Sequence, residues 1–274
     1  MDLTVCGNAP DTVGKRSSPM LGVSQRCEDE MHLDSVRHRL QSGRPAIGTW
    51  LTLDSPIGAE WMAHQGFDWL AVEQTRGLQD QDRVVGLLRA IGTASALPLL
   101  RVPWKDPRTV AQALDTGAAG LIVPGIETPT EAEQCVAAAR SASARLASPG
   151  ADPPLVVVAL DTALGLENVE QILGVAGIDV CFVSTADLCA ALGIDRCQGT
   201  NDRRYLDAIR TVLAACRSHG VAAGIQVRTS ERALRHLADG WQFVGVGSDG
   251  ELMARAAAQT VAAIRERTYG ALRP

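Results

Sequence analysis

Eight short apolar runs alternate with helix-like segments along most of the chain, and this alternation predicts an α/β fold. The runs are continuous instead of alternating with polar residues, which is typical of parallel strands buried on both faces. Eight strand–helix units in about 240 residues fit a closed (β/α)8 barrel of the TIM type better than a doubly wound sheet. We therefore predict a single barrel domain over residues 29–274, preceded by a flexible arm over residues 1–28.

The predicted strands and helices follow one another in a regular order. The strands are expected at 46–53, 68–73, 97–102, 120–124, 155–161, 179–184, 221–227 and 241–247. The helices are expected at 28–43, 55–66, 80–91, 106–117, 128–140, 167–177, 186–193, 202–218, 230–240 and 250–267.

Two of these helices carry clear start signals. Ser55 and Asp106 are suitable N-cap residues, and each is followed by a proline at the first helical position. Gly117 stands where the second of these helices should end.

Composition excludes several classes of function. Hydrophobic residues make up 46% and charged residues 21%, which is ordinary for a water-soluble domain, and the net charge of −5 argues against nucleic acid as a partner. No apolar run approaches the roughly 18 residues of a membrane span, so no membrane partner is expected. Seven scattered cysteines without a CxxC pair, and a polar N-terminus unlike a signal peptide, indicate a reduced cytoplasmic protein.

In a (β/α)8 barrel the chemistry lies at the carboxyl ends of the strands. This rule selects candidate residues from position alone: Trp50, Glu73, Arg76, Arg101, Pro124, Asp161, Ser184, Asp187, Gln226, Ser248 and Asp249.

Each of these candidates has a functional and a structural interpretation. Asp161 and Asp187, at adjacent strand ends, could share a hard divalent cation or could cap the helices that follow. Arg101 could bind a carboxylate or enolate oxygen, or could form a buried ion pair with Glu73. Trp50 could form a wall of a small-molecule pocket, or could plug the barrel.

Other motifs are weak. Residues 245–250 read GxGxxG, but a dinucleotide site needs a further βαβ unit that the chain has no room for, so a tight turn is expected there. None of the five histidines falls at a predicted strand end, and no Cys–His or Ser–His pair is suggested.

Several segments occur in an order that resembles the HpcH/HpaI family, including the macrophomate synthase branch. They are GTWL, GFDWLAVE, LLRVPW, LDTGAAGLIVPGIETPTEA, LDTALGLENVEQILGVAGIDVCFVSTADLCAALG and FVGVGSD, between about residue 45 and residue 255. The resemblance implies a class II, metal-dependent aldolase of 2-oxo acids on a barrel similar to the phosphoenolpyruvate/pyruvate domain. It also implies a homo-oligomer of two to six subunits in which the last helix is exchanged.

The resemblance assigns roles to individual residues. It implies that Asp161 and Asp187 bind Mg²⁺, Mn²⁺ or Co²⁺, and that Arg101 steadies the enolate oxygen of pyruvate. It places Trp50 in the substrate pocket, and Pro124, selected by its place at a strand end, is expected to bind substrate as well. The backbone N–H groups of Ala186 and Asp187 are expected to hold the substrate carboxylate.

The chain departs from the family pattern at the general base. The family reads Asp-x-Glu-His-Gly after the second strand, and this chain reads Glu73-Gln74-Thr75-Arg76-Gly77. A guanidinium stays protonated near neutral pH, so Arg76 cannot replace the histidine as a base. Further departures are Ala159 in place of a glutamine, Asp161 in place of the glutamate ligand, Ser184-Thr185 in place of Gly-Pro, and a different loop after the fourth strand.

Two functions follow. The first is a carbon–carbon lyase or enolate-forming enzyme in which the metal and oxyanion half of the site is retained, with Arg101, Arg76 and Glu73 as its catalytic residues. Decarboxylation of an oxaloacetate-like acid would suit it, because the enolate forms without removal of a hydroxyl proton, and a role in specialised metabolism is one possibility. The alternative is a non-catalytic aldolase-fold protein, such as a binding subunit.

Overall fold

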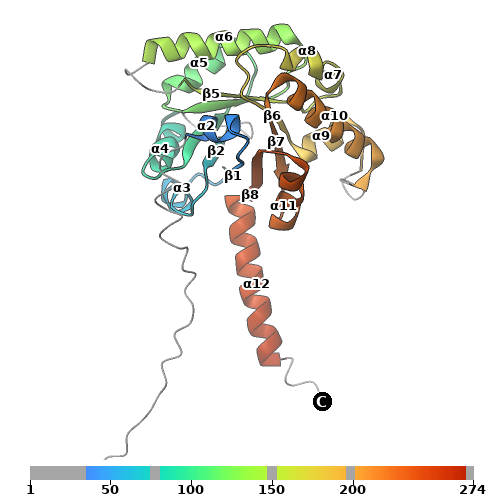
Figure 1. The fold of residues 1–274 in the computed structure, drawn as a ribbon. Coiled ribbons are helices and arrows are strands. Elements are labelled where there is room, and N and C mark those ends of the chain that lie inside the picture. Colours follow the sequence, from blue (N-terminus) through green and yellow to red (C-terminus); the bar gives the residue numbers. More distant parts are fainter. Residues whose placement is uncertain (1–34, 75–80, 147–152, 196–200, 270–274) are drawn as a thin grey trace, which may run out of the picture. The chain divides into compact units, whose positions relative to one another are not determined.

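The computed structural model describes residues 35–74, 81–146, 153–195 and 201–269, all within one compact unit, Asp34–Pro274. In these residues eight parallel strands pair in chain order, and β8 pairs with β1 to close the barrel (Figure 1). The strands are β1 Ala46–Leu51, β2 Trp69–Glu73, β3 Leu97–Arg101, β4 Gly120–Val123, β5 Leu155–Ala159, β6 Val180–Val183, β7 Ala222–Val227 and β8 Phe243–Ser248. The predicted (β/α)8 barrel is confirmed, whereas the arm predicted over 1–28 lies outside the described residues.

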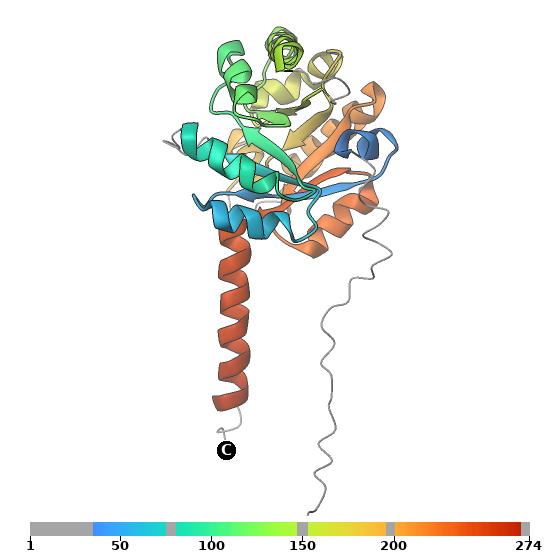
Figure 2. The same ribbon diagram turned by 90° about the vertical axis from the view of Figure 1, so that its left-hand side faces the viewer.

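One helix precedes the first strand, most of the others follow a strand and cover the outside of the barrel, and the last extends away from it (Figure 2). They are α2 Val36–Gln41, α3 Pro56–Ala63, α4 Gln81–Ile91, α5 Pro107–Asp115, α6 Pro129–Leu146, α7 Ala163–Glu167, α8 Val169–Leu173, α9 Thr185–Ala191, α10 Arg203–His219, α11 Ser230–Asp239 and α12 Asp249–Tyr269. None of the helices within the described ranges is both long and apolar enough to cross a bilayer.

The predicted helix starts are confirmed by hydrogen bonds. The Gly58 N–H donates to Ser55 Oγ at 3.1 Å. The N–H groups of Arg108 and Thr109 both donate to Asp106 Oδ1 at 3.1 Å.

The helix predicted over 167–177 is present but shorter, as α8, and α7 just before it was not predicted. Two short helices, α7 and α8, meet at Asn168, which ends the first and begins the second. The Asn168 side chain donates to the Glu127 carbonyl at 2.8 Å, a contact across 41 positions that no local pattern reveals.

Aromatic rings fill the barrel interior. Trp69 stacks on Phe243 with ring centroids 4.2 Å apart, and Trp50 and Phe182 meet these rings edge-on. Gly48 makes room for Trp69, because a Cβ at that position would collide with the indole. The interior is therefore a packed core, and space for chemistry is left at the carboxyl end of the strands.

Helix α12 begins where β8 ends, at this same carboxyl end. Both views show it leaving the barrel as a single straight helix (Figures 1 and 2). Its residues 256–268 are exposed, although Val261 and Ile264 are large apolar side chains.

Candidate functional site

Arg101 joins three carboxylates at the carboxyl end of the barrel. Its Nη1 lies 3.1 Å from Glu73 Oε2, and its Nη2 lies 3.5 Å from Oδ2 of both Asp161 and Asp187. Glu73 and Arg101 are partners in the register of β2 and β3, so strand pairing itself brings them together. Residues that end or follow β2, β3, β5 and β6 therefore meet around one guanidinium.

This cluster is mostly withdrawn from water. The side chains of Glu73, Arg101 and Asp161 are 16% exposed or less, whereas that of Asp187 is 45% exposed, so the cluster opens to solvent on the β6 side. Burial raises the pKa of Asp161, and the charge of Asp187 adds to this, although Arg101 acts in the opposite direction. Three carboxylates against one guanidinium leave an excess of negative charge, which favours a bound cation.

Trp50 covers one side of the cluster. The Arg101 guanidinium carbon lies 5.8 Å from the centroid of its indole ring, a distance at which a cation is attracted to an aromatic face. The indole N–H donates to Gln226 Oε1, and Gln226 Nε2 donates to the Gly247 carbonyl at 2.9 Å. Trp50 is only 8% exposed, so it both plugs the barrel and forms the floor beneath Arg101.

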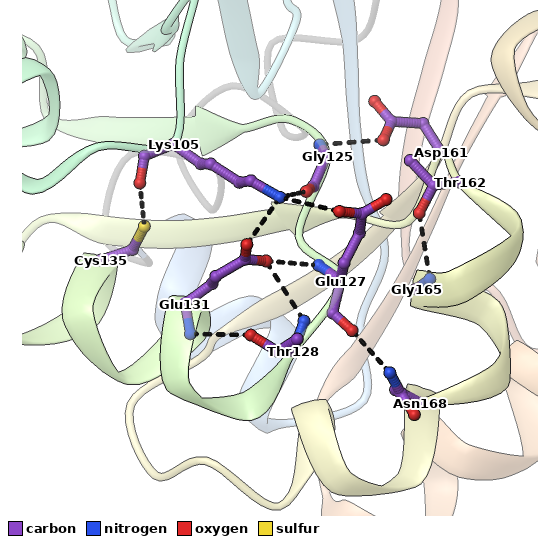
Figure 3. Close-up of polar contacts among 10 residues, drawn as sticks. All are labelled: Lys105, Gly125, Glu127, Thr128, Glu131, Cys135, Asp161, Thr162, Gly165 and Asn168. Atoms are coloured by element: carbon purple, nitrogen blue, oxygen red, sulfur yellow. Dashed lines mark hydrogen bonds and ion pairs between the residues drawn. The ribbon is translucent and has the colours of Figure 1, made fainter.

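Asp161 is also held by a backbone N–H group. Its Oδ1 accepts a hydrogen bond from the Gly125 N–H at 2.9 Å (Figure 3). Gly125 has a φ of 65°, in the left-handed region that favours glycine. It directly follows Pro124, which is partly buried at the end of β4.

The helices after Asp161 and Asp187 have other caps. Thr162 Oγ1 accepts from the Gly165 N–H at 3.0 Å, and Ser184 Oγ accepts from the Asp187 N–H at 3.4 Å. The interpretation of the two aspartates as helix caps is therefore wrong, and both carboxylates are left for other ligands. The same geometry means that Ser184 competes for the Asp187 N–H that the resemblance assigns, together with that of Ala186, to a substrate carboxylate.

Of the remaining candidates, Asp249 and Ser248 have structural roles, and one lies outside the described ranges. Asp249 accepts from the N–H groups of Thr52, Leu53 and Gly250 at 2.9, 3.1 and 2.8 Å, which fixes the chain after β1 to the start of α12. Ser248 Oγ accepts from the Glu251 N–H at 3.3 Å. Arg76 lies outside the described residues.

The donor set fits a divalent cation that keeps several water or substrate ligands. In the described part of the chain, no group of three or more His, Cys, Asp and Glu side chains is placed to bind a metal ion. Asp161 Oδ2 and Asp187 Oδ2 lie at equal distances from one nitrogen of Arg101, so they are separated by at most twice 3.5 Å. Two oxygen ligands of this kind suit Mg²⁺ or Mn²⁺, which complete their coordination with water and substrate oxygens.

The sequence did not reveal the role of Gly125. A glycine directly after the Pro124 strand end was the available signal, but its contact with Asp161 spans 36 positions. Two cavities among the described residues lie elsewhere: one of about 390 Å³ is lined by residues that include Arg37 and Gly240, and one of about 420 Å³ lies between α6 and α8. Neither includes a residue of the Arg101 cluster.

Comparison with known proteins identifies the family of the chain. The HpcH/HpaI aldolase/citrate lyase family model matches residues 46–256. A hydroxypyruvate/pyruvate aldolase of Deinococcus radiodurans is 35% identical over 86% of this chain and 91% of its own length. A 4-hydroxy-2-oxo-heptane-1,7-dioate aldolase of Escherichia coli is 33% identical over 82% of this chain and 92% of its own length.

Solved structures show the same architecture. An HpcH/HpaI aldolase/citrate lyase family protein of Burkholderia cenocepacia superposes with a TM-score of 0.78 at 32% identity, covering 84% of this chain and 99% of its own. Macrophomate synthase shares the fold, with a TM-score of 0.76 at 18% identity over 92% of this chain and 99% of its own. The non-catalytic alternative is not retained, because the named aldolases match most of the chain. The chain belongs to the HpcH/HpaI aldolase/citrate lyase family and is a lyase of that type.

Proposed function

We propose that this lyase acts on a 2-oxo acid with the help of a divalent cation held by Asp161 and Asp187. The placement of Arg101 among carboxylates from β2, β5 and β6 carries the proposal. Both similar aldolases are named for 2-oxo acids, which supports the substrate class. When bound, the cation would act as a Lewis acid that polarises the 2-oxo group.

The residues around the cation have separate tasks. Arg101 would donate hydrogen bonds to the oxygen on which negative charge develops, and Glu73 holds its guanidinium at 3.1 Å. Trp50 keeps water from one side of Arg101. We assign substrate-binding roles to Pro124, to the Ala186 N–H and to the Asp187 N–H, whose 3.4 Å hydrogen bond to Ser184 Oγ a substrate carboxylate would replace.

The lack of a histidine base directs the choice of reaction. In decarboxylation of a 3-carboxy-2-oxo acid, the bond between C3 and the carboxylate breaks, CO₂ leaves, and the electron pair forms the enolate. No proton has to be removed for this step, so a site without a general base can carry it out. Arg76 would bind the second carboxylate of such a substrate as a cation.

The test is turnover of oxaloacetate by metal-stripped protein, with Mn²⁺ added or with chelator. We expect turnover above the rate of free Mn²⁺, loss of that excess with chelator, and its loss in Asp161→Asn. If oxaloacetate and pyruvate-derived aldols both react no faster than with free Mn²⁺, the proposal is wrong.

We also propose a reduced, cytoplasmic location and no nucleic-acid or membrane partner. Cys135, Cys181, Cys189 and Cys216 are free thiols and are buried, in keeping with a reducing compartment.

A further inference from the structure

We propose that Lys105 is a positioning residue for Asp161, acting through the turn between β4 and α6. The inference rests on the proposed function, because Asp161 matters here as a ligand of the cation. Lys105 is one of two lysines in the chain, and it lies four positions after the end of β3.

The ammonium of Lys105 is held by three oxygens of the β4–α6 segment (Figure 3). Its Nζ donates to the Gly125 carbonyl at 2.6 Å and lies 2.8 Å from Glu131 Oε1 and 3.1 Å from Glu127 Oε2. The Lys105 side chain therefore fixes the carbonyl of the residue whose N–H binds Asp161.

Gly125 links Lys105 to Asp161 through the two backbone groups on either side of its α-carbon. Its N–H donates to Asp161 Oδ1 at 2.9 Å, and its carbonyl accepts from Lys105 at 2.6 Å. Glycine at a φ of 65° has wide conformational freedom, so the direction of the N–H depends on what holds the neighbouring carbonyl. The hydrogen bond occupies Oδ1 of Asp161 and directs Oδ2 towards Arg101 and the proposed cation site.

The rest of the turn is anchored to the same network. Glu131 Oε2 accepts from the N–H groups of Glu127 and Thr128 at 2.8 and 3.2 Å, and the Glu131 N–H donates to Thr128 Oγ1 at 3.3 Å, which is a capping box at the start of α6. Cys135 Sγ lies 3.2 Å from the Lys105 carbonyl, so the backbone of Lys105 is tied to α6 as well. Without the ammonium, the carboxylates of Glu127 and Glu131 would face each other unscreened.

A direct chemical role for Lys105 is disfavoured by its charge. Burial would lower its pKa, but the hydrogen bonds and charges of Glu131 and Glu127 outweigh burial and raise the pKa. The amine stays protonated and does not act as the nucleophile that a Schiff base requires.

If Lys105 positions Asp161, loss of its side chain should weaken cation binding. If Lys105 acts only through its charge, the same loss should strengthen cation binding. Removing a positive charge near a cation site strengthens cation binding if only Coulomb attraction matters. Removing a residue that orients a metal ligand weakens binding, typically by about 10- to 100-fold. The sign of the change in affinity therefore tests the proposal.

The experiment measures the affinity of the metal-stripped full chain for Mn²⁺. Titration calorimetry gives the affinity, and the electron paramagnetic resonance signal of free Mn²⁺ gives a second, independent value. We expect Lys105→Met to bind Mn²⁺ at least about tenfold more weakly than the wild type. Lys105→Arg, which keeps a charged donor, should recover most of the affinity. The matched control is Arg145→Met, which removes a cation paired with Asp115 at 3.5 Å between α6 and α5, and it should leave the affinity unchanged.

Thermal unfolding of each variant separates misfolding from a specific effect. If Lys105→Met does not fold, Lys105→Leu takes its place, because its apolar side chain likewise lacks both the charge and the N–H donor. Equal or tighter Mn²⁺ binding by the folded uncharged variant would overturn the role of Lys105. Failure of the wild type itself to bind Mn²⁺ would instead overturn the proposed function.

Discussion

Arg101 is the residue on which the site is built. Its guanidinium has N–H groups on several sides, so it can contact Glu73, Asp161 and Asp187 together while one face lies towards Trp50. The functional and structural interpretations of this arginine are therefore compatible, because an ion pair with Glu73 holds it where an oxyanion would bind.

Replacing Arg101 should separate catalysis from cation binding. We expect Arg101→Gln to lower kcat for a 2-oxo acid by about 10²- to 10³-fold, because a donor to the developing oxyanion is lost. Affinity for Mn²⁺ should stay equal or rise, since a positive charge beside both aspartates is removed. Steady-state kinetics and Mn²⁺ titration measure the two effects, and an unchanged kcat would contradict the assigned role.

Arg76 should be unable to act as the general base. A positioned base contributes about 10²- to 10⁴-fold, and an arginine stays protonated at working pH. We therefore expect aldol cleavage of 4-hydroxy-2-oxo acids to be weak in the unmodified protein. The double variant Glu73→Asp, Arg76→His should gain metal-dependent cleavage, whereas Arg76→Ala should gain none. Strong cleavage that survives Glu73→Ala would show that another residue is the base.

At the scale of elements, small polar residues at helix starts keep the carboxylates available. Thr162 and Ser184 cap α7 and α9, so Asp161 and Asp187 do not have to. Asp106 does serve as a cap: its hydrogen bonds with the Thr109 side chain and the Thr109 N–H are the main reasons that its pKa is lowered.

The cap of α5 should contribute stability that depends on pH. We expect Asp106→Ala to reduce the free energy of unfolding by about 1 kcal/mol near pH 7. Because the pKa of Asp106 is lower in the folded state, its contribution is present above the unfolded-state pKa and is lost as pH falls through the folded-state pKa. Urea unfolding at several pH values measures this, and Asp106→Asn, which caps without a charge, should lack the pH dependence. A deficit of Asp106→Ala that does not shrink in acid would argue against a charged cap.

At the scale of the whole molecule, exposed apolar side chains point to assembly. Met253, Val261 and Ile264 are 62%, 46% and 60% exposed on one face of α12, and Ile57 and Trp61 of α3 are 65% and 70% exposed. A helix face of this kind is costly to leave in water. We propose that α12 packs against a second copy of the chain, as the family resemblance implies.

Charge on that face should disrupt the assembly. We expect the wild type to be a homo-oligomer of two to six subunits by light scattering, and the double variant Val261→Glu, Ile264→Glu to form smaller species, because burial of the new carboxylates would be unfavourable. Gln259→Glu, on the opposite face of α12, is the control and should assemble normally. A monodisperse monomer for the wild type would contradict the proposal.

Local patterns were sufficient for most elements of the fold. Continuous apolar runs predicted the strands, and Ser55 and Asp106 predicted two helix starts, because a cap and its N–H partners lie within three positions. Where a contact spans many positions, the sequence failed. The junction of α7 and α8 at Asn168, whose side chain donates to the Glu127 carbonyl, was not predicted, and neither was the hydrogen bond from the Gly125 N–H to Asp161.

The sequence by itself determined the barrel, the order of its strands and the set of side chains at their carboxyl ends, since hydrophobic periodicity and caps are local properties. Only the tertiary structure decided which of those side chains meet. Closure of the sheet and the register between neighbouring strands bring Glu73, Arg101, Asp161 and Asp187 together, while Asp249 is turned to the backbone of Thr52 and Leu53. The contacts of Lys105 were also decided by the tertiary structure. Its partners lie about 20 to 26 positions further along the chain, and local sequence patterns do not show which residues at such separations form hydrogen bonds.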